Sequence, residues 1–451
     1  MARNINQVNA LRKLIHYGAV SRVARLLEKL HPADVAEVIP DLSPVETKQL
    51  MEVLFATRRA GVTFRELPEP FLGKLLGLIS DERLALLVSR QPSDDALFFL
   101  SLLPPARLEA VSAHLEPGPR ELFERLLRYP PGSAGSVMTT KVLSAKQDIT
   151  AEEALEHIRR QGKDLEAIFY LYVVDDAQIL TGVVALRQLI LSPGDKPLRE
   201  LMQRAPISVS VLEDQGTVAT LVAKYNFLSL PVTDEKGRLV GVVTVDDVID
   251  VIHEEATEDL YHIAGLEEED RAFGPVLGSV RKRFVWTMVN LGTAFLASLV
   301  IGLFEGSIEK IVALATFMPV VAGLGGNSGT QSLTVVIRGL ATGELLPRVA
   351  WKAILRQLLV GLLVGIAAGL ATGTIVYLWK GDPWLGLVLF LAMLANMAVG
   401  ALVGAAVPFL LKLVRQDPAM GSGILVTGIT DSFGFLTFLG LATLFLLKLA
   451  P

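Results

Sequence analysis

Hydrophobic positions divide the chain into two parts with different patterns. After residue 283, long apolar stretches follow one another at about 284–304, 312–337, 354–379, 384–411 and 424–447. Each stretch reaches the roughly 20 residues that a helix needs to cross a bilayer. Five such stretches in succession predict five transmembrane helices rather than the buried core of a soluble helical domain.

Residues 1–130 show a shorter, helical period. Leucine recurs every three or four positions, which is typical of amphipathic helices. Helix-start signals occur in His31-Pro-Ala-Asp34, Leu42-Ser-Pro-Val-Glu46 and Leu103-Pro-Pro-Ala-Arg-Leu108. We expect short helices stacked in pairs as a superhelix.

Residues 131–258 contain an internal repeat. The segments 171–190 and 230–249 align without gaps at an offset of 59 residues, with eight of twenty positions identical. Each predicts a strand, an acidic turn, a second strand and a helix. A further amphipathic helix is expected before each copy, at 151–160 and 215–225. The pattern resembles a tandem pair of CBS domains, which sense ligands and often bind adenine nucleotides.

The resemblance implies a nucleotide site only in the second copy. Thr244 and Asp247 have the spacing with which CBS domains hold a ribose, whereas the first copy has Ala185 and Gln188 at these positions. ATP is therefore one ligand to consider. The alternatives are a plain helix cap by Thr244 and metal binding by Asp247.

An acidic run follows the repeat. Eleven carboxylates occur between Asp246 and Asp270 without an intervening Lys or Arg. Like charges three or four residues apart destabilise a helix, and a divalent cation would remove that repulsion. The segment leads directly into the first apolar stretch, so cation binding here would be coupled to the membrane part. A solvated acidic linker is the alternative. The candidate regulatory ligands are Asp94, Asp246, Asp247, Asp250, Glu254, Glu255, Glu258 and Asp259, with Asp95 beside Asp94.

Composition restricts the function classes. Residues 1–283 carry 33 Lys/Arg and 41 Asp/Glu, which argues against nucleic acid as a partner. The chain has no cysteine, so disulfides, thiolate metal sites and cysteine nucleophiles are excluded. Its six histidines lack metal-ligand spacing, and we find no phosphate loop or nucleophile–base pair. We therefore expect that the protein is not an enzyme.

Basic residues predict the orientation in the membrane. Arg281, Lys282 and Arg283 precede the first stretch, and the other clusters fall on the same side of the membrane. By the positive-inside rule, the N-terminal half is cytoplasmic and the C-terminus lies outside. Since Met1–Ala10 lacks an apolar signal-peptide core, we expect a multi-pass protein of the inner (plasma) membrane.

Polar residues inside the apolar stretches mark a candidate ion pathway. Asp431 is the one acid away from the stretch ends, and Thr427, Thr430 and Gly434 share its helical face. Intramembrane acids are costly and usually functional. The alternative is a structural partner for Arg338 or for a helix-end amide.

The second stretch carries another polar face, at Gly325, Gly326, Asn327 and Thr330, with Pro319 upstream. Close helix packing with interhelical hydrogen bonds is the alternative interpretation here. Asn396 in the fourth stretch is an isolated polar residue, for which a packing hydrogen bond is the simplest explanation.

One carboxylate with hydroxyls, amides and carbonyls is an all-oxygen environment. It suits Mg²⁺, Ca²⁺ or Mn²⁺ better than softer metals. Because Mg²⁺ dehydrates reluctantly, a single carboxylate would bind the hydrated ion. A two-fold dimer would present two copies of Asp431 around one axis.

The order of these parts resembles the MgtE family of Mg²⁺ channels over nearly the whole chain. The most specific motifs are Gly325-Gly-Asn-Ser-Gly-Thr-Gln-Ser332 and Thr430-Asp-Ser-Phe-Gly434, together with Ala134-Gly-Ser-Val-Met-Thr139 before the CBS pair. The resemblance implies a helical N-domain (1–130), tandem α/β CBS domains (131–258), a connecting helix or linker (259–280) and a five-helix transmembrane domain (281–451).

The resemblance also implies a homodimer in lipid whose pore is lined by the second and fifth stretches. Hydrated Mg²⁺ would bind between two Asp431 side chains, near Gly325, Gly326, Thr330 and Thr427. Cytosolic Mg²⁺ would bridge the regulatory acids and close the pore. Mn²⁺, Co²⁺ and Ca²⁺ remain open as further ions.

Four residues depart from the family pattern. Thr330 stands where a pore-lining Asn is expected, and Gly423 where a polar gate residue is expected. Asn226 and Phe98 stand where acids are expected. These changes put the sensor in doubt more than the pore.

Two other functions remain open. One is a transporter that couples divalent cations to Na⁺ or H⁺, although coupling usually needs a second ionisable membrane site. The other is a membrane-anchored nucleotide sensor that transports nothing.

Overall fold

The computed structural model describes residues 2–162, 165, 168–266, 270, 276–345 and 347–445. They form two compact units, residues 1–253 and 254–451, and each is described by itself below. The predicted domain borders at 130, 258 and 280 stay predictions. Of the acidic run, residues 267–269 lie outside the described residues.

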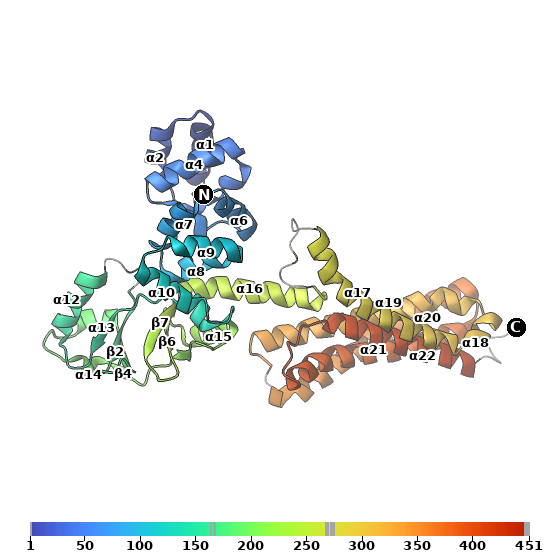
Figure 1. The fold of residues 1–451 in the computed structure, drawn as a ribbon. Coiled ribbons are helices and arrows are strands. Elements are labelled where there is room, and N and C mark those ends of the chain that lie inside the picture. Colours follow the sequence, from blue (N-terminus) through green and yellow to red (C-terminus); the bar gives the residue numbers. More distant parts are fainter. Residues whose placement is uncertain are drawn as a thin grey trace. The chain divides into compact units, whose positions relative to one another are not determined.

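The first unit begins with short helices, drawn in blue to cyan in Figure 1. They are α1 Ala2–His16, α2 Val20–Leu27, α3 Pro32–Ala36, α4 Pro44–Ala56, α5 Ala60–Arg65, α6 Glu69–Gly77, α7 Asp81–Val88, α8 Ser93–Ser101, α9 Pro105–Ala113 and α10 Pro117–Leu126. The predicted start signals are confirmed: His31 caps α3, and Ser43 and Glu46 form a capping box on α4. A proline at the first position of a helix loses no hydrogen bond, which suits α4 and α9.

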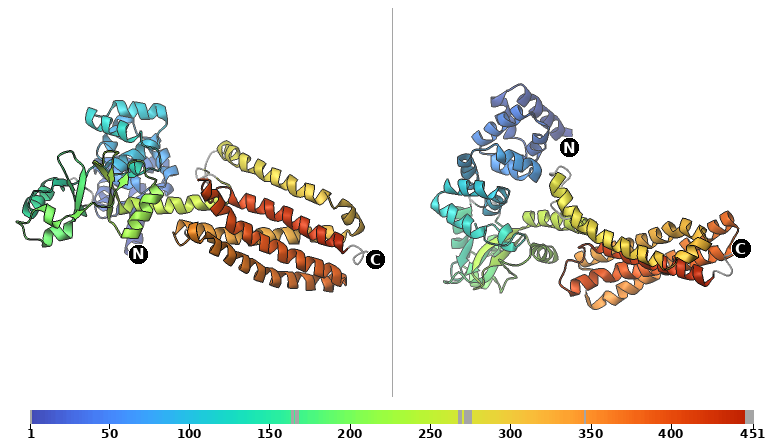
Figure 2. Two further views of the ribbon diagram at one scale, coloured as in Figure 1. Left: turned by 90° about the horizontal axis from the view of Figure 1, so that it is seen from below. Right: turned by 45° about the vertical axis from the view of Figure 1, so that its right-hand side comes forward.

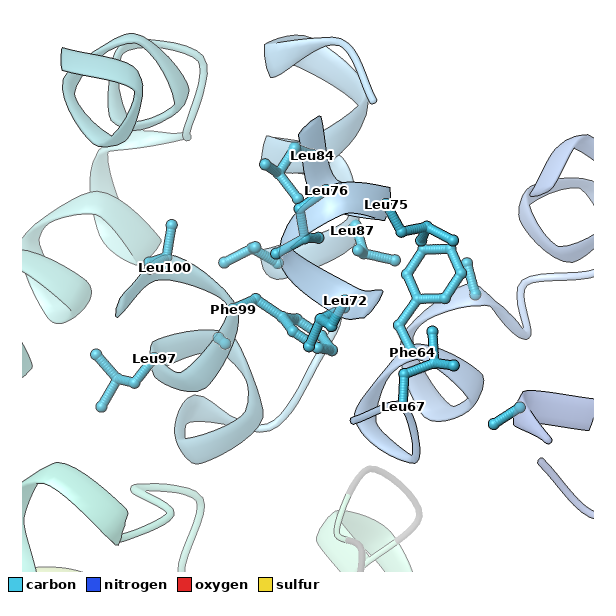
Figure 3. Close-up of a cluster of buried hydrophobic side chains, with 14 of the residues drawn as sticks. Phe64, Leu67, Leu72, Leu75, Leu76, Leu84, Leu87, Leu97, Phe99 and Leu100 are labelled. Atoms are coloured by element: carbon cyan, nitrogen blue, oxygen red, sulfur yellow. The ribbon is translucent and has the colours of Figure 1, made fainter. Parts of the chain in front are cut away.

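Leucine and phenylalanine from successive helices fill the core of this helical part. Phe64 of α5 and Phe99 of α8 are fully buried, as are Leu72, Leu76 and Leu84. Figure 3 shows these side chains pointing towards one another from neighbouring helices. The three- and four-residue spacing of leucine thus provides one apolar face per helix, and the stack buries these faces.

Two small sheets follow, one for each copy of the repeat. The first has the order β1-β2-β3-β4 and the second β5-β6-β7. The strands are β1 Ser144–Lys146, β2 Tyr170–Val174, β3 Leu180–Ala185, β4 Gln203–Arg204, β5 Val209–Ser210, β6 Ser229–Thr233 and β7 Leu239–Thr244. The helices are α11 Ala134–Val137, α12 Ala151–Gln161, α13 Leu186–Leu191, α14 Leu198–Leu201, α15 Gln215–Tyr225 and α16 Val245–Ile263.

The two copies repeat each other in register as well as in sequence. Tyr170 pairs with Ala185 in the first sheet, and Ser229 pairs with Thr244 in the second. Both hairpins shift register directly after the same aligned valine, which is Val173 in one copy and Val232 in the other. The predicted repeat and the helices before each copy are confirmed.

The second unit consists mainly of long helices, which Figure 2 shows running side by side. They are α17 Val276–Gly302, α19 Ala313–Ala341, α20 Ala350–Lys380, α21 Pro383–Leu413 and α22 Ser422–Leu444, with a short α18 at Glu305–Lys310. Among them, α21 contacts α19, α20 and α22, and α17 contacts α22. Pro319 lies inside α19 without ending it.

Within the described residues, four helices are long and apolar enough to cross a membrane: α17, α20, α21 and α22. The remaining long helix, α19, has 29 residues but carries the Gly-Asn-Ser-Gly-Thr-Gln-Ser run, which lowers its hydropathy. A helix with a polar face can lie in a membrane only where protein or water covers that face. The multi-pass membrane character is clear, while the number of five spans stays a prediction.

Candidate functional site

Asp431 lies in the middle of α22 and is half-buried. Thr427 and Gly434 lie one turn away along the same helix face, whereas Thr430 directly precedes Asp431 and is fully buried. The hydroxyl groups of Thr427 and Thr430 donate to the backbone carbonyls of Gly423 at 2.9 Å and Val426 at 3.0 Å. Since its proton is used in this way, the Thr427 hydroxyl oxygen is left as an acceptor one turn from the carboxylate.

No described cation neutralises Asp431. Arg338, the partner considered from the sequence, forms no ion pair with it among the residues that the structure describes. The carboxylate therefore keeps its capacity to attract a cation. This arrangement favours an ion site over a structural salt bridge.

The helix α19 has two distinct faces. Its buried face includes Gly325, Ser328 and Gly329, whereas Asn327 and Thr330 of the predicted pathway are exposed in the single chain. The exposed face continues with Gln331, Thr334 and Arg338 at helical spacing. The predicted polar stripe thus divides: its glycines pack inside the chain and its amide and hydroxyl groups point outward.

Glycines bring the backbones of α19 and α21 into direct contact. A methyl group at Gly404 would lie 2.1 Å from the carbonyl oxygen of Gly329, and one at Gly400 would lie 2.4 Å from that of Gly325. No side chain fits in either place, because the obstacle is backbone. Small residues permit this approach in a membrane helix bundle.

Asn396 of α21 fills a gap between the two candidate pathway helices. It is fully buried, and its Nδ2 donates to the carbonyl oxygen of Val321 at 2.9 Å. Methyl groups at Gly325 of α19 and Gly434 of α22 would lie 2.1 and 2.5 Å from that nitrogen. The structure therefore supports the packing role expected for Asn396, and adds that both glycines make room for it.

The end of α16 lies against the start of α22. The Gly421 N–H donates to the His262 carbonyl at 3.1 Å, and the His262 ring is bonded to the Asp417 carboxylate at 2.5 Å. A methyl group at Gly423 would lie 2.5 Å from the Ile263 carbonyl oxygen. Thus Gly423, where a polar gate residue was expected, permits close contact with α16.

Regulatory acids accompany this contact. Glu258 lies 3.7 Å from His262, while burial and the charges of Asp417 and Glu255 raise the pKa of Asp259. Glu254 is exposed on the same helix. Of the predicted set, Glu258 and Asp259 therefore lie next to the membrane helices, near the start of the helix that carries Asp431.

The remaining predicted acids belong to the first unit. Asp94 and Asp95 lie in the first turn of α8, and Asp246, Asp247 and Asp250 lie in the first two turns of α16. Burial and the neighbouring charge of Asp246 raise the pKa of Asp247 to about 6. Within the described residues, no three such side chains converge into a ready-made metal site.

Arg65 contacts two of these acid-bearing helices, and the sequence analysis did not single it out. It lies at the end of α5 and pairs with Asp95 at 2.9 Å and with Asp250 at 3.0 Å. Phe98, which replaces an expected acid, lies under its guanidinium at 4.5 Å from the ring centre. No local sequence signal joins Arg65 to acids 30 and 185 positions away.

Asn226, the other replaced acid, has a structural reason. It ends α15 in the left-handed conformation, with φ of 54°. Asparagine tolerates this conformation better than most residues other than glycine. The substitution thus suits the helix end.

Hollows on the CBS pair include two near the aligned positions Thr244 and Ala185. A small one, of about 40 Å³, reaches Thr244, Tyr170 and Ser229. The Thr244 hydroxyl already donates a hydrogen bond to the Asp247 carboxylate at 2.5 Å. An open groove of about 730 Å³ lies at the equivalent end of the first copy and is lined by Tyr170, Arg187 and Leu228.

The fold and these residues define a class: a multi-pass membrane protein that carries a pair of CBS-like repeats in its first unit and a carboxylate inside one of its apolar helices. The comparisons with known proteins agree. A model of divalent cation transporters matches residues 318–441, a model of the MgtE intracellular N domain matches 30–132, and the CBS domain model matches 134–193 and 198–254.

Full-length relatives give the family. The magnesium transporter MgtE of Thermus thermophilus is 35% identical over 97% of this chain and 98% of its own length. That of Bacillus subtilis is 29% identical over 96% of each chain. The chain belongs to the MgtE family.

Two solved structures match the first part of the chain. The cytosolic domain of the Mg²⁺ channel MgtE in complex with ATP matches with a TM-score of 0.51 and 32% identity, over 54% of this chain and 99% of that one. The soluble part of a magnesium transporter matches with a TM-score of 0.53 and 28% identity, over 56% and 99%.

Proposed function

We propose that this chain is a Mg²⁺-selective channel for magnesium uptake, with Asp431 at its ion site. The observation that carries the proposal is the half-buried Asp431 in an apolar helix, unpaired with any described cation and flanked by threonine oxygens. Hard oxygen donors of this kind suit Mg²⁺. The names of the full-length relatives support the same ion.

The ion passes in a largely hydrated form. Mg²⁺ keeps several waters unless many oxygens replace them, and each chain offers one carboxylate here. The hydroxyl oxygens of Thr427 and Thr330 and the backbone near Gly325 and Gly326 accept hydrogen bonds from that water shell. Apolar side chains along the rest of the path offer the ion no competing ligands.

The functional unit is a homodimer. In a single chain the polar face of α19, with Asn327, Thr330, Gln331 and Thr334, is exposed. Lipid cannot satisfy these amides and hydroxyls. A second copy related by a two-fold axis covers this face and supplies a second Asp431, whose charge balances the ion.

Cytosolic Mg²⁺ closes the channel through the acids of α8 and α16. Asp94, Asp246, Asp247 and Asp250 in the first unit carry like charges, which a divalent cation among them would neutralise beyond what Arg65 does. Glu254, Glu255, Glu258 and Asp259 continue this acidic surface to the start of α22, where His262 and Gly421 are in contact. The N-terminal half is cytoplasmic, and the C-terminus lies outside the plasma membrane.

The experiment is Mg²⁺ flux into proteoliposomes under an imposed potential, without Na⁺ or a pH gradient. Wild type should conduct, and Asp431→Asn should lose most of the flux because it removes the charge and keeps the shape. Glu309→Gln, which neutralises an exposed acid in a connecting helix, is the matched control and should conduct normally.

Other outcomes choose among the alternatives. Flux that needs Na⁺ or a pH gradient favours a coupled transporter. Equal flux in wild type and Asp431→Asn places the ion path elsewhere. Competition with Mn²⁺, Co²⁺ and Ca²⁺ in the same assay measures selectivity.

A second ligand, ATP, is proposed for the CBS pair. The open groove beside Tyr170 and Arg187 has room for a nucleotide, with an aromatic ring and a cation at hand. The cavity at Thr244 is much smaller, and its hydroxyl is already bonded. Arg187→Gln should weaken ATP binding measured by calorimetry, while Thr244→Val should leave it unchanged.

A further inference from the structure

Arg65 joins two segments that carry the proposed regulatory acids. Its Nε lies 2.9 Å from Asp95 of α8, and an Nη lies 3.0 Å from Asp250 of α16. The side chain of Arg65 is 29% exposed and that of Asp95 is 13% exposed, so the Arg65–Asp95 pair is largely shielded from water, whereas Asp250 is 57% exposed. An ion pair of this kind is stronger than one on the surface.

The guanidinium is also held in place by packing. Its carbon lies 4.5 Å from the centre of the Phe98 ring, a cation–π distance. Arginine has a planar fork that can reach two carboxylates while stacking on an aromatic face. Phe98 therefore orients Arg65 towards both acids.

We infer that Arg65 is a built-in cation in the acidic cluster formed by Asp95 of α8 and the acids of α16, and that it determines how strongly this cluster responds to divalent cations. The inference rests on the proposed regulation of the channel by cytosolic Mg²⁺. The guanidinium takes over part of the bridging role proposed for a metal ion, because it pairs with one carboxylate of the helical part and with one of α16.

Charge gives the direction of the effect. Asp95, Asp246, Asp247 and Asp250 bring four carboxylates to this region, and Arg65 offsets one. A unit charge about 6 Å from a doubly charged ion weakens ion binding about tenfold in water, and more where the site is buried. With Arg65 present, the acidic cluster of α8 and α16 is held together without Mg²⁺. It also binds Mg²⁺ more weakly than the acids alone would.

Hydrogen exchange measured by mass spectrometry on the detergent-purified full-length protein tests this inference. Peptides covering 60–65 and 245–253 report the contact, in EDTA and in a Mg²⁺ titration. Wild type should show the same slow exchange in both conditions. Arg65→Gln should exchange faster in EDTA and become as slow as wild type when Mg²⁺ is added.

Arg83→Gln is the matched control. Arg83 also pairs with a carboxylate, Glu52, and packs on a ring, Phe55, but it lies away from α16. It should behave like wild type in both peptides. Asp250→Asn removes the other end of the bridge from an exposed position and should speed exchange in EDTA even if Arg65→Gln folds poorly.

Three results would overturn the inference. Wild-type exchange that slows with Mg²⁺ as strongly as in Arg65→Gln would mean that Arg65 does not replace the ion. Equal exchange of wild type and Arg65→Gln in EDTA would mean that the bridge holds nothing. Fast exchange in Arg65→Gln that Mg²⁺ does not slow would make the arginine purely structural. Exchange needs no transport, so an inactive wild type in the flux assay would refute the proposed function separately.

Discussion

The contact between α19 and α21 leaves no room for a side chain at Gly404. A methyl group there would lie 2.1 Å from the carbonyl oxygen of Gly329 and 2.9 Å from its carbonyl carbon. An ordinary carbon–oxygen contact needs roughly 3.3 Å, so Gly404→Ala must push the helices about 1 Å apart. The same shift would disturb the neighbouring contact of Gly400 with Gly325.

The magnitude follows from overpacking. Forcing an extra methyl into a close-packed interior costs typically 1–3 kcal/mol. Gly292 of α17 is the control, since a methyl group there meets nothing within 4 Å. Alanine is also the better helix former by about 1 kcal/mol, which favours both variants equally. The two variants should therefore differ by about 1–3 kcal/mol in stability.

Melting of the detergent-purified protein, followed by size-exclusion chromatography after heating, measures this difference. For a unit of this size each kcal/mol shifts Tm by about 2–4 °C. Gly404→Ala should melt roughly 2–12 °C below Gly292→Ala and conduct less Mg²⁺. If both variants melt together and conduct equally, the helices do not meet at these glycines and the description of the pathway is wrong.

Three further variants test other parts of the structure. Because folding raises the pKa of Asp247 from 3.8 to about 6, the free energy of unfolding of the wild type should fall as pH rises through this range, by at most about 3 kcal/mol. Asp247→Asn should not show this loss when both proteins are melted in EDTA at pH 4 to 8. Asn396→Asp should lower Tm more than Asn396→Ala, since a carboxylate would be fully buried there; the reverse order would contradict the packing role. Gly421→Ala should speed hydrogen exchange in peptide 258–265, because Gly421 has φ of 60° and a methyl would meet the Trp286 ring at 2.1 Å; unchanged exchange would dissociate α16 from α22.

Much of the architecture follows from local patterns in the sequence. Apolar runs of more than 20 residues become α17, α20, α21 and α22, because only a helix satisfies its backbone within one segment. The repeat at an offset of 59 residues appears again in both hairpins, down to the register shift after Val173 and Val232. These features depend on neighbours close in sequence, which is why periodicity alone predicts them.

The division of α19 into two faces needed the tertiary structure. Its Gly-rich motif reads as a single polar stripe, and the sequence does not say which of its residues meet another helix. Packing against Gly400, Gly404 and Asn396 buries Gly325 and Gly329 and leaves Asn327 and Thr330 exposed. The same close contact explains glycines that composition alone would attribute to flexibility.

The charge of the acidic run alone predicts a cation site. The arginine that pairs with the run could not be found from charge along the sequence. Arg65 lies 185 positions before Asp250 along the chain, at the end of a six-residue helix with nothing unusual about it. Only the stacking of short helices brings it to Asp95 and α16. Local periodicity and charge determine which segments become helices, strands and acidic surfaces, whereas contacts between distant residues decide which charge neutralises which.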